Sequence, residues 1–194
     1  MKDFFAELRP AILATLVLAV VCSGLYPLVV FGISQALFHD KANGSLIVDP
    51  NGIVRGSKLL GQNFTDAKYF HPRPSAAGNG YDAANSGASN LGPTSEKLKN
   101  AINDRIEAYR KENNLDANSA VPADAVTTSG SGLDPHISVH NAELQTPRVA
   151  KTRGQSEDKV RELVRQNTNG PDLGFLGDAG VNVVTLNRAL DQLR

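Results

Sequence analysis

The 194-residue sequence lacks features that would each point to a class of protein. It has one cysteine, Cys22, so it cannot form the intramolecular disulfides of a small secreted scaffold. Its 20 Lys and Arg balance 20 Asp and Glu, whereas a nucleic-acid-binding protein carries a basic excess. It has no Gly-Lys pair, which the Walker phosphate-binding loop requires, and no Asp-Lys-Thr-Gly run of the kind that carries an aspartyl nucleophile. The sequence therefore predicts no nucleic-acid partner and no phosphate-transferring centre of its own.

One long stretch near the N-terminus lacks charge. No Asp, Glu, Lys, Arg or His occurs between Arg9 and His39. About 20 apolar residues are enough for a helix to cross the hydrocarbon core of a bilayer, where a backbone must satisfy its own polar groups. We therefore expect a cytoplasmic tail at 1–9, a transmembrane anchor region at 10–38 with its helix at about 11–33, and a soluble extracytoplasmic domain at 39–194.

A cleaved signal peptide and a lipoprotein signal are the alternatives to an anchor. Signal peptides have apolar cores of about 7–15 residues, whereas this run continues through Tyr26 to Phe31. Two small residues are expected just before a lipidated cysteine, but Val20 and Val21 precede Cys22. Both features favour an uncleaved anchor.

The charges that flank the anchor predict its orientation. The short tail carries Lys2, Arg9 and the free amine against Asp3 and Glu7. Positive charges on a short flank tend to stay in the cytoplasm, while a long following part can be translocated regardless of its charge. We expect a single-pass inner-membrane protein with its N-terminus in the cytoplasm.

Small residues recur along the predicted anchor helix. Thr15, Ala19 and Ser23 are spaced four apart, and Pro27 continues the same face. Small side chains let helices approach closely, which is a main source of association in lipid. Pro27 also lacks a backbone donor, which favours a kink. These four residues form a candidate helix-packing face, although small residues are also a general feature of membrane helices.

The rest of the chain predicts a single α+β domain with a small sheet and several helices. Turn-forming residues at 50–52 between two apolar runs predict a hairpin. Apolar spacing predicts a helix at 95–112, capped by Thr94 or Ser95.

Later segments carry further start signals. Asp134-Pro135 and Thr146-Pro147 each read as a cap followed by a proline at the first helical position, and the first helix is expected to reach Gln145. Another helix is expected after Ser156. A strand at 181–186 and a terminal helix at 187–193 then leave strands at both ends with helices between.

Two loops are the candidate contact regions. The segment 71–94 is dominated by small and polar residues, and loops of this length are functional or disordered. A Ser-Gly-Ser-Gly run before a predicted helix start can form a nest of backbone N–H groups that binds an anion, or a plain flexible turn. The candidate partner or anion contacts are Ser86, Asn90, Ser129, Gly130, Ser131 and Gly132.

Two constellations resemble catalytic or metal sites only in part. His136 and His140 would share a helix face, but the HExxH pattern is absent and a third ligand would have to be His71 or a carboxylate. The hydroxyl, acid and imidazole types of a hydrolytic triad occur within 129–136, yet triad members usually come from distant segments. We predict no catalytic residues and no metal site.

Several motifs follow one another in a specific order: GSKLLGQNF at 56–64, YFHPRPSA at 69–76, SGASNLGP at 86–93, SGSGLDPHIS at 129–138, PRVA at 147–150 and VNV at 181–183. This ordered set resembles the C subunit of Kdp-type potassium-transporting ATPases over the whole chain, anchor included. His71-Pro72-Arg73 stands where a His-Gly-Arg is expected, and Asp178-Ala179-Gly180 is a variant of a more charged turn.

The resemblance implies a non-catalytic accessory subunit of an ATP-driven high-affinity potassium uptake complex. The implied partners are a channel-like potassium-binding subunit, a P-type ATPase catalytic subunit and a small single-span subunit. The implied role is assembly, or raising the ATP affinity of the ATPase subunit, so that ATP belongs to the complex and no cofactor is assigned to this chain.

The expected topology places the domain away from cytoplasmic ATP, so any effect on ATP binding would travel through the membrane helices. The alternative function is a membrane-anchored extracytoplasmic ligand-binding module, which would act without partners and hold a small-molecule pocket.

Overall fold

The structure is a computed structural model that describes residues 2–193, with side chains described from residue 6 onward. The chain divides into two compact units, Met1–Arg55 and Gly56–Arg194. An N-terminal apolar helix is followed by two small sheets and several helices, which confirms the predicted α+β class.

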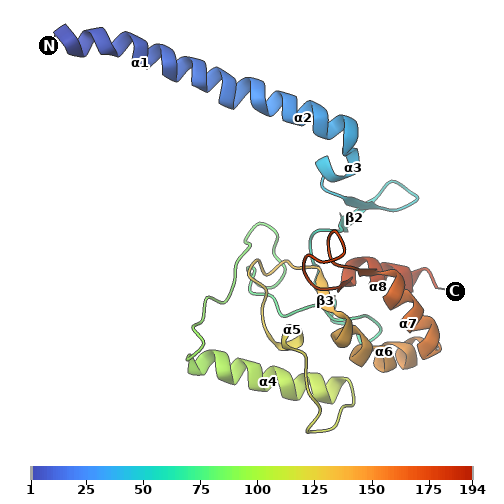
Figure 1. The fold of residues 1–194 in the computed structure, drawn as a ribbon. Helices are drawn as coiled ribbons and strands as arrows, with labels where there is room; N and C mark the ends of the chain where they lie inside the picture. Colours follow the sequence, from blue (N-terminus) through green and yellow to red (C-terminus); the bar gives the residue numbers. More distant parts are fainter. Residues whose placement is uncertain (1, 194) are drawn as a thin grey trace. The chain divides into compact units, whose positions relative to one another are not determined.

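The first unit is dominated by one long helix (Figure 1). It comprises α1 (Lys2–Val20), a π-helical turn η1 (Val21–Leu25) and α2 (Tyr26–Leu37), and it extends further at both ends than the expected 11–33. The part Ala6–Leu37 is long and apolar enough to cross a membrane, and none of its most apolar window is buried against the rest of the chain.

Pro27 is the second residue of α2, which follows the π-helical turn. A proline inside a helix has no N–H, and its ring crowds the carbonyl one turn before it. The π turn accommodates this, and the Tyr26 N–H donates to the Val21 carbonyl five residues back. Figure 1 shows α1 and α2 continuing as one gently curved helix, so a π-helical turn accompanies the proline and the helix axis has no sharp kink there.

A short helix, α3 (His39–Ala42), and the predicted hairpin follow. Strands β1 (Leu46–Val48) and β2 (Val54–Ser57) form a two-stranded sheet. The Asp49 N–H donates to the Ile53 carbonyl at 2.9 Å, and Gly52 takes the positive φ of 77° that closes the turn.

The second unit holds α4 (Glu96–Glu112), α5 (Ala123–Val126), β3 (His136–Ser138), α6 (Val139–Arg153), α7 (Glu157–Gln166), β4 (Thr168–Asn169), β5 (Gly180–Asn182) and α8 (Val183–Asp191). The strands form an antiparallel sheet in the order β3-β5-β4. The helices α6, α7 and α8 and this sheet enclose one core, which includes Phe70, Ile137, Val149, Val160, Val164, Val181, Leu186 and Leu190.

Two predicted helix starts are confirmed by their caps. The Ser95 hydroxyl accepts the Leu98 N–H at the start of α4, and the Ser156 hydroxyl accepts the Lys159 N–H at the start of α7. In both places a serine cap precedes an acidic first turn, which satisfies free N–H groups and complements the helix dipole.

The two helix starts expected at Asp134-Pro135 and Thr146-Pro147 are wrong. Strand β3 follows Pro135, because the Asp134 carboxylate accepts the His136 N–H at 2.9 Å in a local turn. The helix α6 begins after Ser138 and runs through Pro147. Buried apolar side chains of α6 pack on the core, and this packing outweighs the roughly 3 kcal/mol that an internal proline costs.

The strand expected at 181–186 ends at Asn182. The Asn182 side chain accepts the N–H groups of Val184 and Thr185, both at 3.1 Å, and so caps α8. A short apolar run is equally compatible with a buried strand and a buried helix. The Asn182 cap therefore ends β5 and begins α8 at this point of the apolar run.

Candidate functional site

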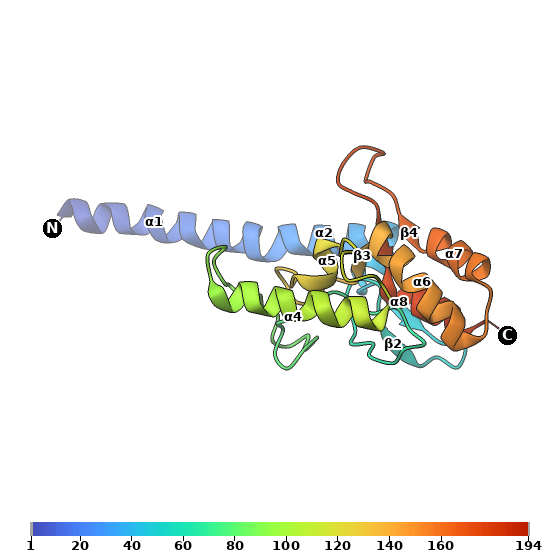
Figure 2. The ribbon, with the colours of Figure 1, turned by 90° about the horizontal axis from the view of Figure 1, so that it is seen from below.

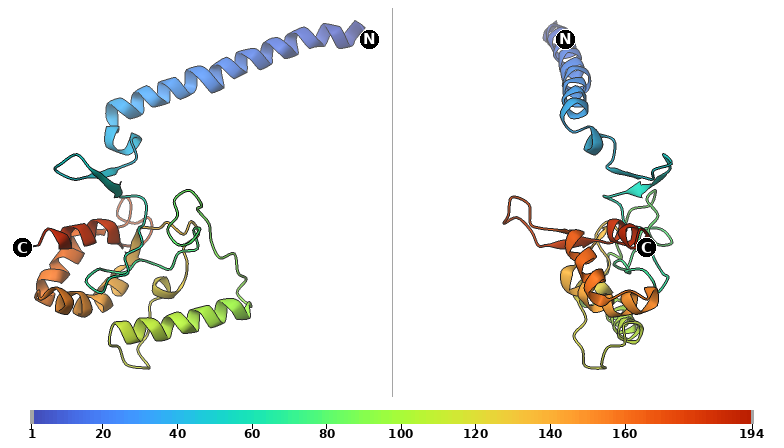
Figure 3. Two further views of the ribbon diagram at one scale, coloured as in Figure 1. Left: turned by 180° about the vertical axis from the view of Figure 1, so that it is seen from behind. Right: turned by 90° about the vertical axis from the view of Figure 1, so that its right-hand side faces the viewer.

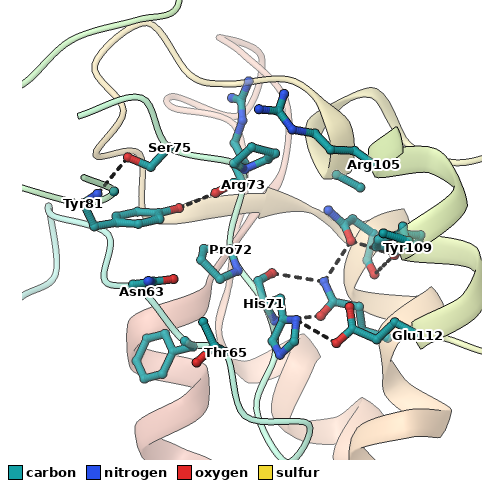
Figure 4. A pocket seen from close by; sticks show the side chains of 17 residues that line it. Asn63, Thr65, His71, Pro72, Arg73, Ser75, Tyr81, Arg105, Tyr109 and Glu112 are labelled. Carbon is teal, nitrogen blue, oxygen red and sulfur yellow. Dashed lines mark hydrogen bonds and ion pairs between the residues drawn. The ribbon is translucent and has the colours of Figure 1, made fainter. Parts of the chain in front are cut away.

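A pocket of about 430 Å³ opens in the second unit between the segment 63–81, the helix α4 and the start of α6 (Figure 4). Its volume is within the range of small-molecule sites. The chemistry-bearing residues that line it are His71, Arg73, Tyr81, Arg105, Tyr109 and Glu112.

The first wall is the irregular segment 63–81, whose second half belongs to the segment 71–94 that the sequence predicts to be functional or disordered. It has no helix or strand, yet its backbone is held at several points. The Ser75 hydroxyl donates to the Gly132 carbonyl at 2.6 Å and accepts the Tyr81 N–H at 2.8 Å. Phe70 and Ala77 are fully buried. The segment is therefore an ordered wall that long-range contacts define.

Side-chain amides from α6 form the floor. The Gln145 amide binds both backbone groups of His71, accepting its N–H at 2.7 Å and donating to its carbonyl at 3.1 Å. The Asn141 Oδ1 accepts from Gln145 at 2.9 Å and from the Tyr109 hydroxyl at 2.8 Å. This network joins the segment 63–81 to α4 and α6, as Figure 4 shows.

A buried guanidinium supports that floor. Arg148 donates to the carbonyls of Ala67 and Tyr69, at 2.6 and 3.0 Å, and to the side chains of Gln145 and Asn113, at 2.8 and 3.0 Å. Burial lowers the pKa of Arg148, which reflects the cost of removing this cation from water. The bonds connect three segments that are far apart in the sequence.

Two arginines direct their side chains at the backbone of residues 126–128. Arg73 pairs with Asp134 at 2.9 Å and points a second nitrogen at the Thr128 carbonyl, at 3.4 Å, while Arg105 donates to the Val126 carbonyl at 2.9 Å. In the described part of the chain, the Arg73 Nε is buried without a hydrogen-bond partner. A buried donor without an acceptor is costly, so an acceptor atom of a ligand would be stabilised there.

The two tyrosines of the pocket serve as hydrogen-bond donors. Burial raises the pKa of Tyr81 and of Tyr109, so both phenols are neutral near pH 7. The Tyr81 hydroxyl donates to the Arg73 carbonyl at 2.6 Å. Neither group is suited to exchange protons at neutral pH.

His71 and Glu112 form an ion pair across the pocket when the histidine is protonated, with Nδ1 and Oε1 3.0 Å apart. The hydrogen bond from His71 lowers the pKa of Glu112, and partial burial opposes this effect. A carboxyl with a lowered folded-state pKa contributes stability above its unfolded pKa, and this stability is lost as the pH falls through the lower folded value.

We therefore predict an acid-sensitive contribution from Glu112. The Glu112→Gln variant should be less stable than the parent at pH 6 by at most about 1 kcal/mol, since the carboxylate is more than a third exposed. The difference should shrink as the pH falls below the ordinary glutamate value of 4.5. Thermal melts of both full-length chains from pH 6 to pH 3 measure it. A difference that grows toward low pH would contradict this assignment.

The residues predicted as partner or anion contacts lie in two segments that the fold brings together. The Ser86 hydroxyl donates to the Ser131 carbonyl at 3.0 Å. Gly132 has a φ of 68°, and a Cβ there would lie 2.7 Å from backbone atoms of Ala77 and Gly87. Ser129 is buried, whereas Gly130 is exposed.

Asn90 is exposed with a left-handed φ of 50°. Strand β3, and not a helix, comes next after Gly132, so the helix N-terminus that the anion-nest hypothesis required is not at this place. The contacts of these residues with a partner or an anion stay a prediction.

The histidine pair does not share a helix face, because His136 lies in β3 and His140 in α6. The His136 ring nitrogens lie 3.7 Å from Asp134 Oδ1 and 3.0 Å from Asn169 Nδ2. Within residues 2–193, no three His, Cys, Asp or Glu side chains gather in a way that could hold a metal ion.

The long apolar helix Ala6–Leu37 carries a shallow apolar hollow. Its lining residues are Ala19, Val20, Ser23, Gly24, Leu25 and Leu28. Two members of the predicted packing face thus line the hollow, while Thr15 and Pro27 do not. The Thr15 hydroxyl donates to the Ala11 carbonyl at 2.8 Å within the same helix.

Sequence reasoning missed Gly24 and the residues of the pocket. Gly24 is adjacent to Ser23 in the sequence, so it could have been included in the predicted helix-packing face. Arg73 lies in a quoted motif without an assigned role, and Arg105 and Glu112 fall on a helix that was predicted only as a helix. Nothing in one sequence pairs His71 with Glu112.

The apolar helix and the α+β domain define a membrane-associated subunit. The family model described as K+-transporting ATPase, c chain, matches residues 8–192. A potassium-transporting ATPase KdpC subunit from Mycobacterium bovis is 57% identical over 187 residues, which cover 96% of this chain and 98% of that relative. The KdpC subunit from Koribacter versatilis is 49% identical over 95% of this chain and 94% of that relative. The KdpC subunit from Geobacter metallireducens is 47% identical over 96% of this chain and 98% of that relative. The chain belongs to the KdpC family.

Proposed function

We propose that this chain is a non-catalytic accessory subunit that helps an ATP-driven, high-affinity potassium uptake complex to assemble. The observation that carries the proposal is the full-length match, which runs through both the anchor helix and the domain. The relatives' printed name makes each of them a subunit of a potassium-transporting ATPase. The match covers 98% of the Mycobacterium bovis relative, which supports the same role for this chain.

The partners in this proposal are a P-type ATPase catalytic subunit, a channel-like potassium-binding subunit and a small single-span subunit. The helix Ala6–Leu37 crosses the bilayer, and the hollow at Ala19, Ser23 and Gly24 receives a helix of one of these subunits. Thr15 and Pro27 extend the packing face along the helix. Small side chains suit such a site because they allow the backbones to approach closely.

The proposed orientation is a cytoplasmic N-terminus and an extracytoplasmic domain. A Lys151→Cys variant in a Cys22→Ala background tests it, because Lys151 is exposed on the domain. A membrane-impermeant maleimide should label this cysteine in cells whose inner membrane is intact. Labelling only after the inner membrane is broken would contradict the orientation.

Assembly and ATP affinity are two roles that one experiment separates. Membranes from potassium-starved cells with and without this chain are compared for potassium-stimulated ATP hydrolysis as a function of ATP concentration. An assembly role predicts that the remaining subunits separate and that the maximal rate falls. A role in ATP affinity, transmitted through the membrane helices, predicts an intact complex with a higher KM for ATP. No change in either quantity would contradict the proposal.

A second candidate function is a membrane-anchored extracytoplasmic ligand-binding module. The buried, unpartnered Nε of Arg73 beside a pocket of about 430 Å³ favours a ligand with a carboxylate or other acceptor oxygen. Acetate, succinate and inorganic phosphate are the probes, and the thermal midpoint of the full chain in detergent is the readout. A shift that an Arg73→Lys variant, which keeps the charge but lacks the Nε donor, reduces would support this function. The absence of any shift at millimolar concentrations would contradict it.

A further inference from the structure

The loop between β4 and β5 presents three large apolar side chains to solvent. Leu173, Phe175 and Leu176 are 83%, 74% and 52% exposed. Figures 2 and 3 show this loop standing away from the helices of the second unit. We call residues 170–179 the apolar tip.

The apolar tip has a defined backbone. Asp172 and Leu176 exchange two backbone hydrogen bonds, both at 2.9 Å, and form an isolated β-bridge. The Gly174 N–H donates to the Pro171 carbonyl at 3.1 Å, and the Phe175 N–H donates to the Asp172 carbonyl at 3.2 Å. A turn with these bonds holds its backbone in one arrangement, which lowers the entropy cost of ordering the loop on binding.

Leu173 occupies a conformation that leucine rarely adopts. Its φ is 54°, a left-handed value that Gly and Asn tolerate more easily. The side chain has no compensating burial, because it is the most exposed of the three. A strained backbone at an exposed apolar residue points to a use for that side chain outside its own fold.

The charges beside the apolar side chains restrict what can cover them. Asp172 and Asp178 are both exposed, and residues 170–179 contain no Lys or Arg. Anionic lipid attracts basic residues and repels acidic ones. Membrane-interface loops also favour Trp and Tyr, which this tip lacks. A protein groove with a basic rim satisfies both the apolar and the acidic residues.

We propose that the apolar tip docks into an apolar groove with a basic rim on another subunit of the potassium-transporting ATPase. The inference rests on the proposed function, because a chain that acts alone has no such subunit. Phe175 and Leu173 enter the groove, as aromatic and large apolar residues do at interface centres. Asp172 and Asp178 pair with the rim and set the orientation.

The first test places a photo-crosslinking benzophenone analogue at Phe175 in the full chain, within the complex from potassium-starved cells. The expected product is one adduct with another subunit. The same analogue at Leu59, which is exposed on the same unit outside the tip, is the control and should give no such adduct. Crosslinking to lipid alone at Phe175 would overturn the inference.

The second test uses variants that separate docking from folding. A Leu173→Asn change relaxes the strained backbone, so the thermal midpoint of the chain should stay the same or rise. Recovery of the other subunits in high-salt washes should fall by roughly tenfold or more. A lower thermal midpoint together with unchanged recovery would mean that Leu173 has only a structural role, and would overturn the inference.

The third test uses charge reversal, because the two possible surfaces respond with opposite signs. The double change Asp172→Lys and Asp178→Lys should weaken recovery of the complex if a basic rim is present. A bilayer would instead hold the tip more tightly, and the analogue at Phe175 would then crosslink more to phosphatidylglycerol vesicles.

If the unsubstituted chain recovers no subunit at all, the proposed function fails and this inference fails with it. Normal recovery for both the parent and the charge-reversed chain contradicts only the inference.

Discussion

Replacing Gly24 by leucine is expected to release the chain from its complex while leaving its own fold intact. A Cβ built at Gly24 meets no atom within 4 Å, so the larger side chain has space within the isolated chain. That space is the hollow shared with Ala19 and Ser23. Filling it would keep a partner helix at a distance, and overpacking a close contact costs about 1–3 kcal/mol. Recovery of the other subunits should fall by about tenfold or more.

Gly32 provides the matched control. It lies in the same long helix, a Cβ there also meets no atom within 4 Å, and it is not part of the hollow. The Gly32→Leu change therefore adds the same side chain to the same apolar helix. Equal losses for the two variants would mean that added bulk anywhere on the helix disturbs the complex, and would remove the hollow as a specific site.

Replacing Arg148 by methionine is expected to destabilise the second unit by about 3 kcal/mol. Methionine keeps a similar length but removes every donor, which leaves the carbonyls of Ala67 and Tyr69 and the side chains of Gln145 and Asn113 without this partner. The wall at 63–81 then loses the Arg148 bonds to α6 and keeps the Gln145–His71 bonds. Thermal unfolding of the full chain in detergent, followed by circular dichroism, measures the change.

Arg161 is the control for that experiment. It forms three ion pairs, with Glu143, Glu157 and Asp158, at 3.6, 2.6 and 3.4 Å, but all of these side chains are at least a third exposed. Exposed pairs contribute about 0–1 kcal/mol. The Arg161→Met change should therefore cost much less than Arg148→Met, although it removes more ion pairs. If Arg161→Met lowers the stability as much as Arg148→Met or more, burial is not what makes the Arg148 bonds important.

Local signals predicted the elements that depend on local physics. The helix α4 begins where Ser95 caps an apolar period, and the long apolar helix Ala6–Leu37 follows from the uncharged stretch between Arg9 and His39. The same local reasoning failed at the two prolines, Pro135 and Pro147. Each follows a capping residue type, yet one leads into a strand and the other lies inside a helix. At Pro135 the Asp134 carboxylate forms a local turn that leads into a strand, whereas at Pro147 packing of α6 on the core outweighs the cost of the proline. The residue types around each proline do not show which of these effects applies.

The pocket could not be predicted for a related reason. His71 bonds to Gln145 across 74 residues, and its ion-pair partner Glu112 comes from a third segment. Spacing along the chain says nothing about such pairs. The ordered set of motifs could identify the family, because it depends on the order of residue types and not on how the loops fold.

Co-purification tests whether this chain is a subunit of a potassium-transporting ATPase. The full chain carries an affinity tag at its C-terminus, membranes from potassium-starved cells are solubilised in mild detergent, and the proteins that remain bound are identified and counted. We expect a P-type ATPase subunit and a channel-like potassium-binding subunit in a fixed ratio to this chain. Their recovery should be reduced by Gly24→Leu and retained by Gly32→Leu. Recovery of a folded chain without partners from those membranes would contradict the account and would favour the anchored ligand-binding module.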